Sequence, residues 1–296
     1  MTPQDGFIIV DKPSGATSFS MVALVRRLTG VRRAGHAGTL DPLASGVLPV
    51  AIGHATRLIE YLDDELKSYR ASVRFGVTTD TYDAEGQVVA TADASLVTAE
   101  RIEAALTAFV GDIRQTPPVY SALKVAGKPL YRYAREGADV AIAERIVHVE
   151  SIRLLAFADA AAEIEVRCGK GTYIRSLAHD LGRELGSGAH LAALVRTSTG
   201  GFGIDDARSP GELTALAAED RLAEAVLAPD RAVERRPAAI LAEAHSLDAV
   251  CGRDLRLDAA AEVAICRAYT AGGEFLGVLK RAEGPFWHPE KMVRGG

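Results

Sequence analysis

One aspartate stands among small and apolar residues, and these surroundings make it the first candidate for chemistry. Residues 35–49 read GHAGTLDPLASGVLP, in which Asp41 is the only acidic side chain. A carboxylate among apolar neighbours is costly unless it is paired or hydrogen-bonded, so we take Asp41 as a candidate catalytic group. An aspartate before a proline can also simply initiate a turn, and His36 can be an ordinary loop histidine. The glycines match neither GxxxxGK[ST] nor GxGxxG, which argues against nucleotide hydrolysis.

A second motif could supply the partner of this carboxylate. Residues 169–175 read GKGTYIR, and they join a predicted strand to a predicted helix, where side chains often face a cleft. Arginine stays protonated and orients a carboxylate, so Arg175 is the candidate partner of Asp41, although a surface pair of this kind would contribute little. Tyr173 lies at the same junction. Tyr69, within the sequence KSYR, is either a stacking surface for a base or an aromatic residue at the edge of the core.

The elements that must position these residues are short helices and strands. Thr17 or Ser18 can cap a helix that ends at Gly30. Apolar periodicity predicts further helices over residues 98–110 and 174–185, and strands over residues 7–10, 72–77 and 163–168. The strands cluster along the chain instead of alternating with helices, which indicates an α+β fold.

Composition is typical of a globular protein. The chain has 296 residues, of which 48% are hydrophobic and 25% are charged. Its three cysteines are too scattered for a disulfide framework, no basic segment precedes an apolar run at the N-terminus, and no stretch is long enough to span a bilayer. We therefore expect a cytoplasmic protein with no membrane association.

Charge is distributed unevenly along the chain. The formal net charge is −5, because 39 acidic residues outnumber 34 lysines and arginines, and this argues against coating of nucleic acid by bulk positive charge. Residues 113–135 nevertheless contain five basic side chains and no acidic one. Such a run is either a solvated face or a local contact with nucleic acid.

The pattern changes near the C-terminal end. Residues 222–237 are rich in Ala, Glu and Arg and contain two prolines. Residues 263–269 and 275–280 then indicate the two strands of a hairpin around a glycine-containing loop. We therefore expect a main domain over residues 1–235 and a smaller β-rich domain over residues 237–296.

Taken together, the motifs resemble those of the TruB family, the bacterial tRNA pseudouridine-55 synthases, in the family's order and over residues 6–205. The matching segments are VDKPSGATS at residues 10–18, GHAGTLDPLASGVLP at 35–49, KSYR at 67–70, TDTYDAEG at 79–86, SALK at 121–124, YRYAREG at 131–137 and KGTYIR at 170–175. Several ordered motifs are far more specific than any single one.

The resemblance implies a fold and a reaction. The fold is a pseudouridine-synthase catalytic domain with a mixed, largely antiparallel sheet flanked by helices, followed by a small PUA-like RNA-binding domain. The reaction flips a uridine out of the T arm of tRNA, at position 55, breaks its N-glycosidic bond and joins C5 to C1′. It uses no metal and no redox cofactor, and the family suggests a monomer that requires no protein partner.

The resemblance also implies a role for each matched residue. Asp41 is the nucleophile or base, and Arg175 is its ion-pair partner. The other matches bind the flipped nucleotide: His36 fills the space that the base leaves, Tyr69 stacks on the uracil, and Tyr173 and Leu194 line the pocket.

Two implied features concern RNA binding. Residues 113–145 form an insertion that grips the T arm, with Lys124 and Lys128 as phosphate contacts. The family pattern continues after the pocket leucine with two arginines, whereas this chain has Val195 followed by Arg196. This departure puts one possible RNA contact in doubt and leaves the pocket unchanged.

Three other functions remain open. A non-catalytic RNA-binding or tRNA-folding module would share the basic residues but would not need Asp41 and Arg175 as a pair. A pseudouridine synthase for another RNA would share the chemistry. A glycoside hydrolase would need a second carboxylate near Asp41, for which Asp80 and Asp83 are the candidates.

Overall fold

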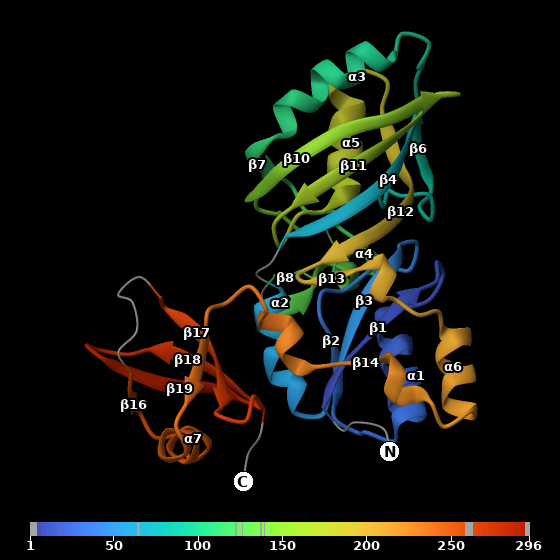
Figure 1. The fold of residues 1–296 in the computed structure, drawn as a ribbon. Coiled ribbons are helices and arrows are strands. Elements are labelled where there is room, and N and C mark those ends of the chain that lie inside the picture. The colour runs from blue at the N-terminus through green and yellow to red at the C-terminus, as the bar shows by residue number, and fades with distance from the viewer. Residues whose placement is uncertain are drawn as a thin grey trace. The chain divides into compact units, whose positions relative to one another are not determined.

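The computed structural model describes residues 5–63, 66–121, 123–125, 127–136, 138, 140–257 and 263–293 (Figure 1). The chain divides into two compact units. The first unit combines residues 1–42, 46–64 and 199–296, and the second comprises residues 43–45 and 65–198.

The first unit is built around strand β1 (Gly6–Lys12), which lies between β3 (Ser45–Ile52) and the short β14 (Val226–Leu227). Both pairings are antiparallel, and β2 (Ala34–His36) adds antiparallel to β3. The four consecutive residues 7–10 are each at most 1% exposed. Burial on both faces explains why an apolar run without alternation forms this strand.

Helix α1 (Ser18–Thr29) packs beside these strands, together with α6 (Pro210–Ala218). Thr17 caps its first turn, because its hydroxyl accepts a hydrogen bond from the backbone N–H of Ser20. Gly30 ends the helix in the left-handed conformation, with a φ of 72°. The predicted caps of this helix are therefore confirmed.

Short elements complete this part of the first unit. They are η1 (Gly53–Leu58), α2 (Ile59–Asp63), β13 (Phe202–Gly203), η3 (Ile204–Asp206), η4 (Leu222–Ala225) and η5 (Pro229–Val233).

The C-terminal residues of the first unit form a second sheet, in the order β15-β17-β18-β19-β16, beside helix α7. These elements are β15 (Ala238–Leu241), α7 (Glu243–Val250), β16 (Leu255–Arg256), β17 (Ile265–Thr270), β18 (Phe275–Arg281) and β19 (Phe286–Met292). The antiparallel pairing of β17 with β18 confirms the predicted hairpin. The expected domain boundary at residues 235–237 falls between η5 and β15, and this division into domains stays a prediction. Residues 258–262 and 294–296 of the expected second domain lie outside the described residues.

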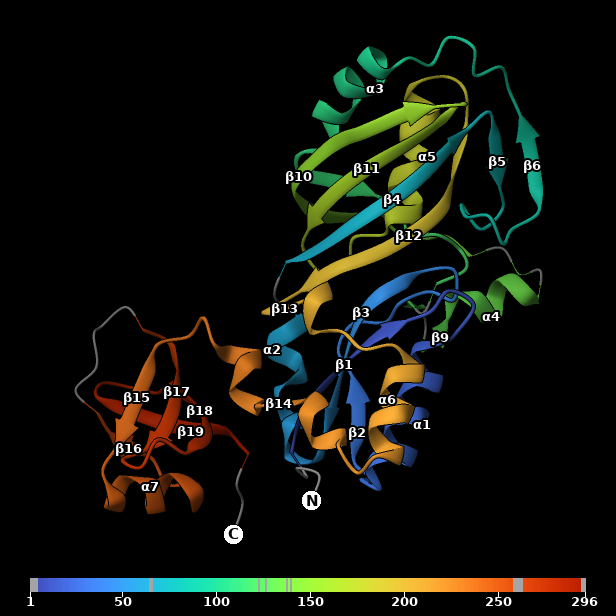
Figure 2. The ribbon, with the colours of Figure 1, turned by 45° about the vertical axis from the view of Figure 1, so that its right-hand side comes forward.

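The second unit contains strands in the order β12-β4-β11-β10-β7, of which β12, β4, β11 and β10 are labelled in Figure 2. They are β12 (Ala189–Thr199), β4 (Lys67–Phe75), β11 (Ala161–Cys168), β10 (Arg145–Ala158) and β7 (Gly111–Gln115). From β4 to β7 each neighbouring pair is antiparallel. Helix α5 (Ile174–Glu184) contacts β4 and helix α3 (Ala99–Leu106) contacts β10, and the two helices also contact each other.

Two hairpins and one helix lie outside this sheet. The first hairpin joins β5 (Val77–Thr79) to β6 (Val88–Thr91), and the second joins β8 (Lys124–Val125) to β9 (Lys128–Pro129), followed by α4 (Leu130–Arg135). Residues 122, 126, 137 and 139 of the expected tRNA-gripping insertion lie outside the described residues.

Two predicted elements differ from the observed ones. Strand β4 begins at Lys67, ahead of the strand expected over residues 72–77, so Tyr69 lies within it. Burial alternates along β4 from its first residue, which shows that the strand includes the polar segment ahead of the expected start. The helix expected over residues 98–110 is α-helical only to Leu106 and continues as the 3-10 helix η2 (Thr107–Phe109).

The fold class is confirmed: the chain is an α+β protein with helices against a sheet and β-rich C-terminal residues. In the part of the chain that the structure describes, no helix has both the length and the apolar character needed to cross a bilayer.

Candidate active site

A buried lysine fixes the loop that carries Asp41 through hydrogen bonds to backbone carbonyls. Lys12, at the end of β1, is 0% exposed. Its ammonium group donates hydrogen bonds to the backbone carbonyls of Ala16 (2.6 Å), Pro13 (3.1 Å) and Pro42 (3.2 Å). Hydrogen bonds from a charged donor are the strong ones, so the backbone directly after Asp41 is fixed to the end of β1.

A buried serine holds the other side of Asp41. The Ser18 hydroxyl, 3% exposed at the start of α1, donates to the carbonyl of Leu40 at 3.0 Å and accepts from the Leu40 N–H at 2.9 Å. Both backbone groups of the residue before Asp41 are therefore satisfied by one side chain. Asp41 itself is half-buried, and Leu40 and Leu48 are at most 3% exposed, which confirms the apolar surroundings that the sequence indicated.

His36 ends β2 and is also half-buried. It pairs with Val50 of β3. Its predicted role in filling the space of a flipped base stays a prediction.

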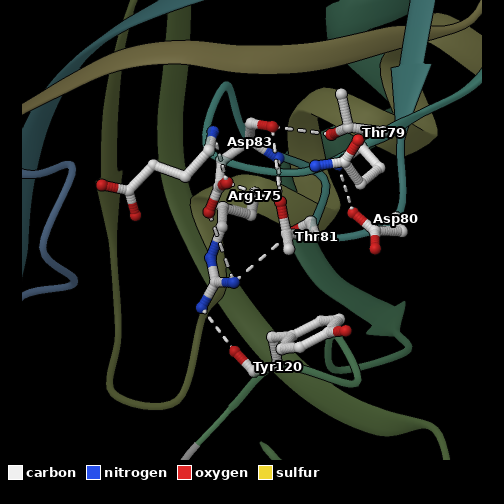
Figure 3. Close-up of polar contacts among 8 residues, drawn as sticks. Thr79, Asp80, Thr81, Asp83, Tyr120 and Arg175 are labelled. Carbon is white, nitrogen blue, oxygen red and sulfur yellow. Dashed lines mark hydrogen bonds and ion pairs between the residues drawn. The ribbon is translucent and has the colours of Figure 1, made fainter. Parts of the chain in front are cut away.

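In the second unit, Arg175 is buried near the start of α5, with 5% of its surface exposed. Figure 3 shows its guanidinium group among three partners. Nη1 lies 3.5 Å from Oδ2 of Asp83 and donates to the carbonyl of Thr81 at 3.3 Å, and Nη2 donates to the carbonyl of Tyr120 at 3.1 Å. A planar guanidinium with several fixed acceptors has a defined orientation, as a partner of a reacting carboxylate would need.

Asp83 is itself held by the turn between β5 and β6. Its Oδ1 accepts hydrogen bonds from the Thr81 hydroxyl at 2.5 Å and from the Glu85 N–H at 3.1 Å, and its backbone carbonyl accepts from the Thr79 hydroxyl at 2.7 Å (Figure 3). Asp83 is 4% exposed. The Asp83 carboxylate is therefore engaged by the Thr81 hydroxyl, the Glu85 N–H and the Arg175 guanidinium, and these contacts argue against a role as the general acid of a glycoside hydrolase.

The other candidate for that role, Asp80, also serves the turn. Its Oδ1 accepts a hydrogen bond from the Gln87 N–H at 2.8 Å (Figure 3). Both carboxylates that the hydrolase hypothesis required thus accept hydrogen bonds from groups of the β5–β6 turn.

Tyr69 and Leu194 are buried residues of neighbouring strands. Tyr69 in β4 is 8% exposed and Leu194 in β12 is 7% exposed. Tyr69 shares the buried face of β4, and this strand contacts α5, the helix that begins next to Tyr173. The structure thus brings these predicted pocket residues to elements that adjoin one another.

Tyr173 precedes α5, and a residue that sequence reasoning missed fixes its backbone. Gln115, 2% exposed at the end of β7, accepts from the Tyr173 N–H at 2.7 Å and donates to the Tyr173 carbonyl at 3.0 Å. One amide side chain thus satisfies both backbone groups of Tyr173, and this fixes the backbone from which the tyrosine side chain projects. Gln115 is 58 residues away in sequence, and no local signal marks it.

Lys128 lies beside an acidic residue just beyond the acid-free run. Its ammonium group forms an ion pair with Glu136 and lies 4.6 Å from the centroid of the Tyr133 ring. Lys124 pairs with Pro129 across the β8–β9 hairpin. Contact of Lys124 and Lys128 with RNA phosphates stays a prediction.

Arg196 in β12 follows Val195, the position at which this chain lacks an arginine of the family pattern. Arg196 is 0% exposed. Its guanidinium group is therefore part of the protein interior and is not displayed to RNA.

Comparison with known proteins identifies the family. The model for the N-terminal domain of TruB family pseudouridylate synthases matches residues 26–174, and the model for the C-terminal domain of tRNA pseudouridylate synthase B matches residues 175–234.

Similar sequences extend over nearly the whole chain. The tRNA pseudouridine synthase B of Dehalococcoides mccartyi is 40% identical over 288 residues, covering 97% of this chain and 96% of the relative. The protein of the same name from Thiobacillus denitrificans is 44% identical over 290 residues, covering 98% of this chain and 96% of the relative.

Solved structures agree with these matches. A chain in the crystal structure of a Cbf5-Nop10-Gar1 complex has a TM-score of 0.76 and 27% identity, covering 99% of this chain and 86% of that chain. A chain in the structure of an H/ACA RNP bound to a substrate RNA has a TM-score of 0.76 and 25% identity, with 98% and 86% covered. The resemblance indicated by the motifs is confirmed, and the chain belongs to the TruB family of pseudouridylate synthases.

Proposed function

We propose that the chain isomerises uridine to pseudouridine in the T arm of tRNA, at position 55, with Asp41 as the catalytic carboxylate. The observation that carries this proposal is the family match, which includes the Asp41 loop that Lys12 and Ser18 fix on both sides. Relatives of similar length bear the name tRNA pseudouridine synthase B, which supports tRNA as the substrate.

The proposed reaction needs one carboxylate and a site that excludes water. Asp41 acts as the nucleophile or as the base that initiates cleavage of the bond between N1 and C1′. The detached uracil rotates within the site, C5 bonds to C1′, and the hydrogen on C5 leaves as a proton while N1 gains one. The burial of Leu40, which precedes Asp41 in the chain, supports this proposal, because water near the reacting sugar would lead to hydrolysis instead.

The other site residues have supporting roles in the proposal. Arg175 is the ion-pair partner of Asp41. The base-binding residues are Tyr69, which stacks on the uracil, Tyr173 and Leu194, which form walls of the pocket, and His36, which fills the space that the base leaves. The low exposure of Tyr69 and Leu194 supports an apolar pocket.

RNA binding is assigned to two further regions. Residues 113–145, with Lys124 and Lys128, grip the T arm, and residues 237–296 form a PUA-like RNA-binding domain. The proposed enzyme acts in the cytoplasm as a monomer without a protein partner. Light scattering of the purified chain in the presence of tRNA tests this, since a complex larger than one chain with one tRNA would contradict it.

A tritium-release assay tests the function. The substrates are tRNA transcripts with uridine labelled at C5, with and without replacement of uridine 55 by cytidine. The protein is compared with Asp41→Asn and with Asp159→Asn, a matched change at the exposed β10–β11 turn. Release by the original chain and by Asp159→Asn, but not by Asp41→Asn, is expected on the transcript that contains uridine 55.

Other outcomes assign other functions. Release that survives Asp41→Asn would exclude Asp41 as the catalytic group. Equal release from the transcript that lacks uridine 55 would place the reaction at another uridine. Tight tRNA binding without release by any variant would indicate an RNA-folding module.

A further inference from the structure

Tyr82 adopts a backbone conformation that a residue with a large side chain normally avoids. Its φ is 63°, in the left-handed region. Such a conformation persists only where the surrounding structure enforces it. Tyr82 directly precedes Asp83, the residue that pairs with Arg175, so whatever holds Tyr82 also bears on this ion pair.

The ring of Tyr82 is held by stacking on helix α5. Its centroid lies 3.9 Å from that of His179, and the two ring planes differ by 16°. Its backbone is held from the other side, because the Tyr82 carbonyl accepts a hydrogen bond from the Leu191 N–H at 2.9 Å. The turn is therefore fixed between α5 and the start of β12.

His179 and Arg175 are four residues apart on α5, so their side chains lie one above the other on the same helix face. Two successive residues of the turn, Tyr82 and Asp83, thus contact two successive positions of one helix face. The stack and the ion pair form a double attachment of the turn to α5.

Little else orients the His179 ring. In the part of the chain that the structure describes, its Nδ1 is buried with no hydrogen-bond partner. The side chain also lines a cavity of about 330 Å³, together with Thr78, Arg183 and Gly188, and so lacks dense packing on that side. Burial lowers the pKa of His179 below its ordinary value, so at pH 7 the ring stacks as a neutral aromatic group.

We propose that Tyr82 and His179 are positioning residues for the reaction: their stack holds the turn on α5 so that Asp83 keeps the Arg175 guanidinium in its reactive orientation. This inference rests on the proposed function, in which Arg175 serves Asp41. Neither Tyr82 nor His179 touches the substrate in this proposal.

The first test separates the ring of Tyr82 from its backbone conformation. Tyr82→Asn keeps a residue that tolerates positive φ but removes the ring, and Tyr82→Phe keeps the ring. We expect kcat for tritium release to fall about tenfold in Tyr82→Asn, with KM within about twofold, because one aromatic stack is lost. Tyr82→Phe retains the original kcat. Val89→Thr, an exposed change in the adjoining strand β6, is the matched control and leaves kcat unchanged.

The second test asks whether Tyr82 acts through Asp83. In a double-mutant cycle of Tyr82→Asn with Asp83→Asn, we expect the double variant to lose little more kcat than the more impaired single variant. Both changes release the same guanidinium group, that of Arg175. Additive losses, or an equal loss of kcat in Tyr82→Phe and Tyr82→Asn, would overturn the proposal.

An NMR measurement that does not depend on enzyme activity tests this inference separately from the proposed function. In the original chain the Nη signals of Arg175, assigned with Arg175→Lys, should be resolved in ¹⁵N-correlated NMR spectra because the fixed guanidinium rotates slowly. In Tyr82→Asn they should broaden or average, whereas in Tyr82→Phe they should not. Unchanged signals in Tyr82→Asn would overturn the proposal even in an inactive enzyme. An original chain that releases no tritium while the NMR result holds would refute the proposed function alone.

Discussion

The two hydrogen bonds between the Ser18 hydroxyl and the Leu40 backbone predict that removing this hydroxyl makes the loop of Asp41 open more often. In Ser18→Ala, the N–H and the carbonyl of Leu40 both lose their partner, while the residue stays buried. Each buried hydrogen bond contributes about 1 kcal/mol, so the closed loop loses about 2 kcal/mol relative to its open form. This corresponds to about a 30-fold increase in the equilibrium constant for opening.

Amide hydrogen exchange of Leu40 measures this opening directly. We expect Leu40 to exchange about 30-fold faster in Ser18→Ala. The matched control is Ser20→Ala in the same helix, where the exposed hydroxyl donates to the Thr17 carbonyl and does not contact the loop. Because Asp41 follows Leu40, kcat should fall more than KM changes in Ser18→Ala.

Two results would show that the Ser18 hydroxyl does not fix the loop. One is unchanged amide exchange of Leu40 in Ser18→Ala, and the other is an equal acceleration of this exchange in Ser20→Ala. The loop of Asp41 would then be held by groups other than the Ser18 hydroxyl.

Three further predictions address other parts of the chain. In Lys12→Met, three charge-assisted hydrogen bonds are lost, and the melting temperature should fall by about 5 °C in a thermal scan; an unchanged value would show that the lysine is dispensable for the fold. In Glu136→Gln, the ammonium group of Lys128 loses its carboxylate partner, so tRNA affinity should rise and its salt dependence should steepen; weaker binding would indicate that the ion pair shapes the insertion. At pH 8 a disulfide reagent should modify the exposed Cys251 rapidly and Cys168 slowly, because burial raises the pKa of Cys168 to about 11; rapid loss of Cys168 would contradict its burial.

Local features of the fold could be predicted from the sequence because they depend on neighbouring residues. The caps of α1 at Thr17 and Gly30 are formed within one helical turn of each end. The β17–β18 hairpin follows from its short glycine-containing loop. Asp41 was recognisable because its unusual surroundings are contiguous in the chain.

The partners of the site residues could not be predicted in this way. Asp83 and Arg175 are joined only when the β5–β6 turn packs on α5. The attachment of Tyr173 to Gln115 likewise joins residues that are 58 positions apart in the chain. Such contacts depend on where tertiary packing places elements, and hydrophobic periodicity contains no information about which polar side chains will meet.

The start of β4 illustrates a different limit. Lys67, Tyr69 and Ala71 face the core in alternation, but a lysine in the first position of this pattern resembles a loop residue by type. Tertiary packing buries the long aliphatic stem of this lysine, and this burial cannot be predicted from the fact that lysine is a charged residue.

The division of the first unit between the two ends of the chain has a consequence for synthesis on the ribosome. Strand β1 is synthesised long before its neighbour β14, which pairs with Phe7 and Ile8 only after residue 227 has been made. Until then β1 has one open edge, and its side chains are apolar ones that the finished protein buries completely. The strands of the second unit, from β4 to β12, are contiguous in the chain and all emerge earlier. The second unit can therefore fold during translation before β14 closes the open edge of β1.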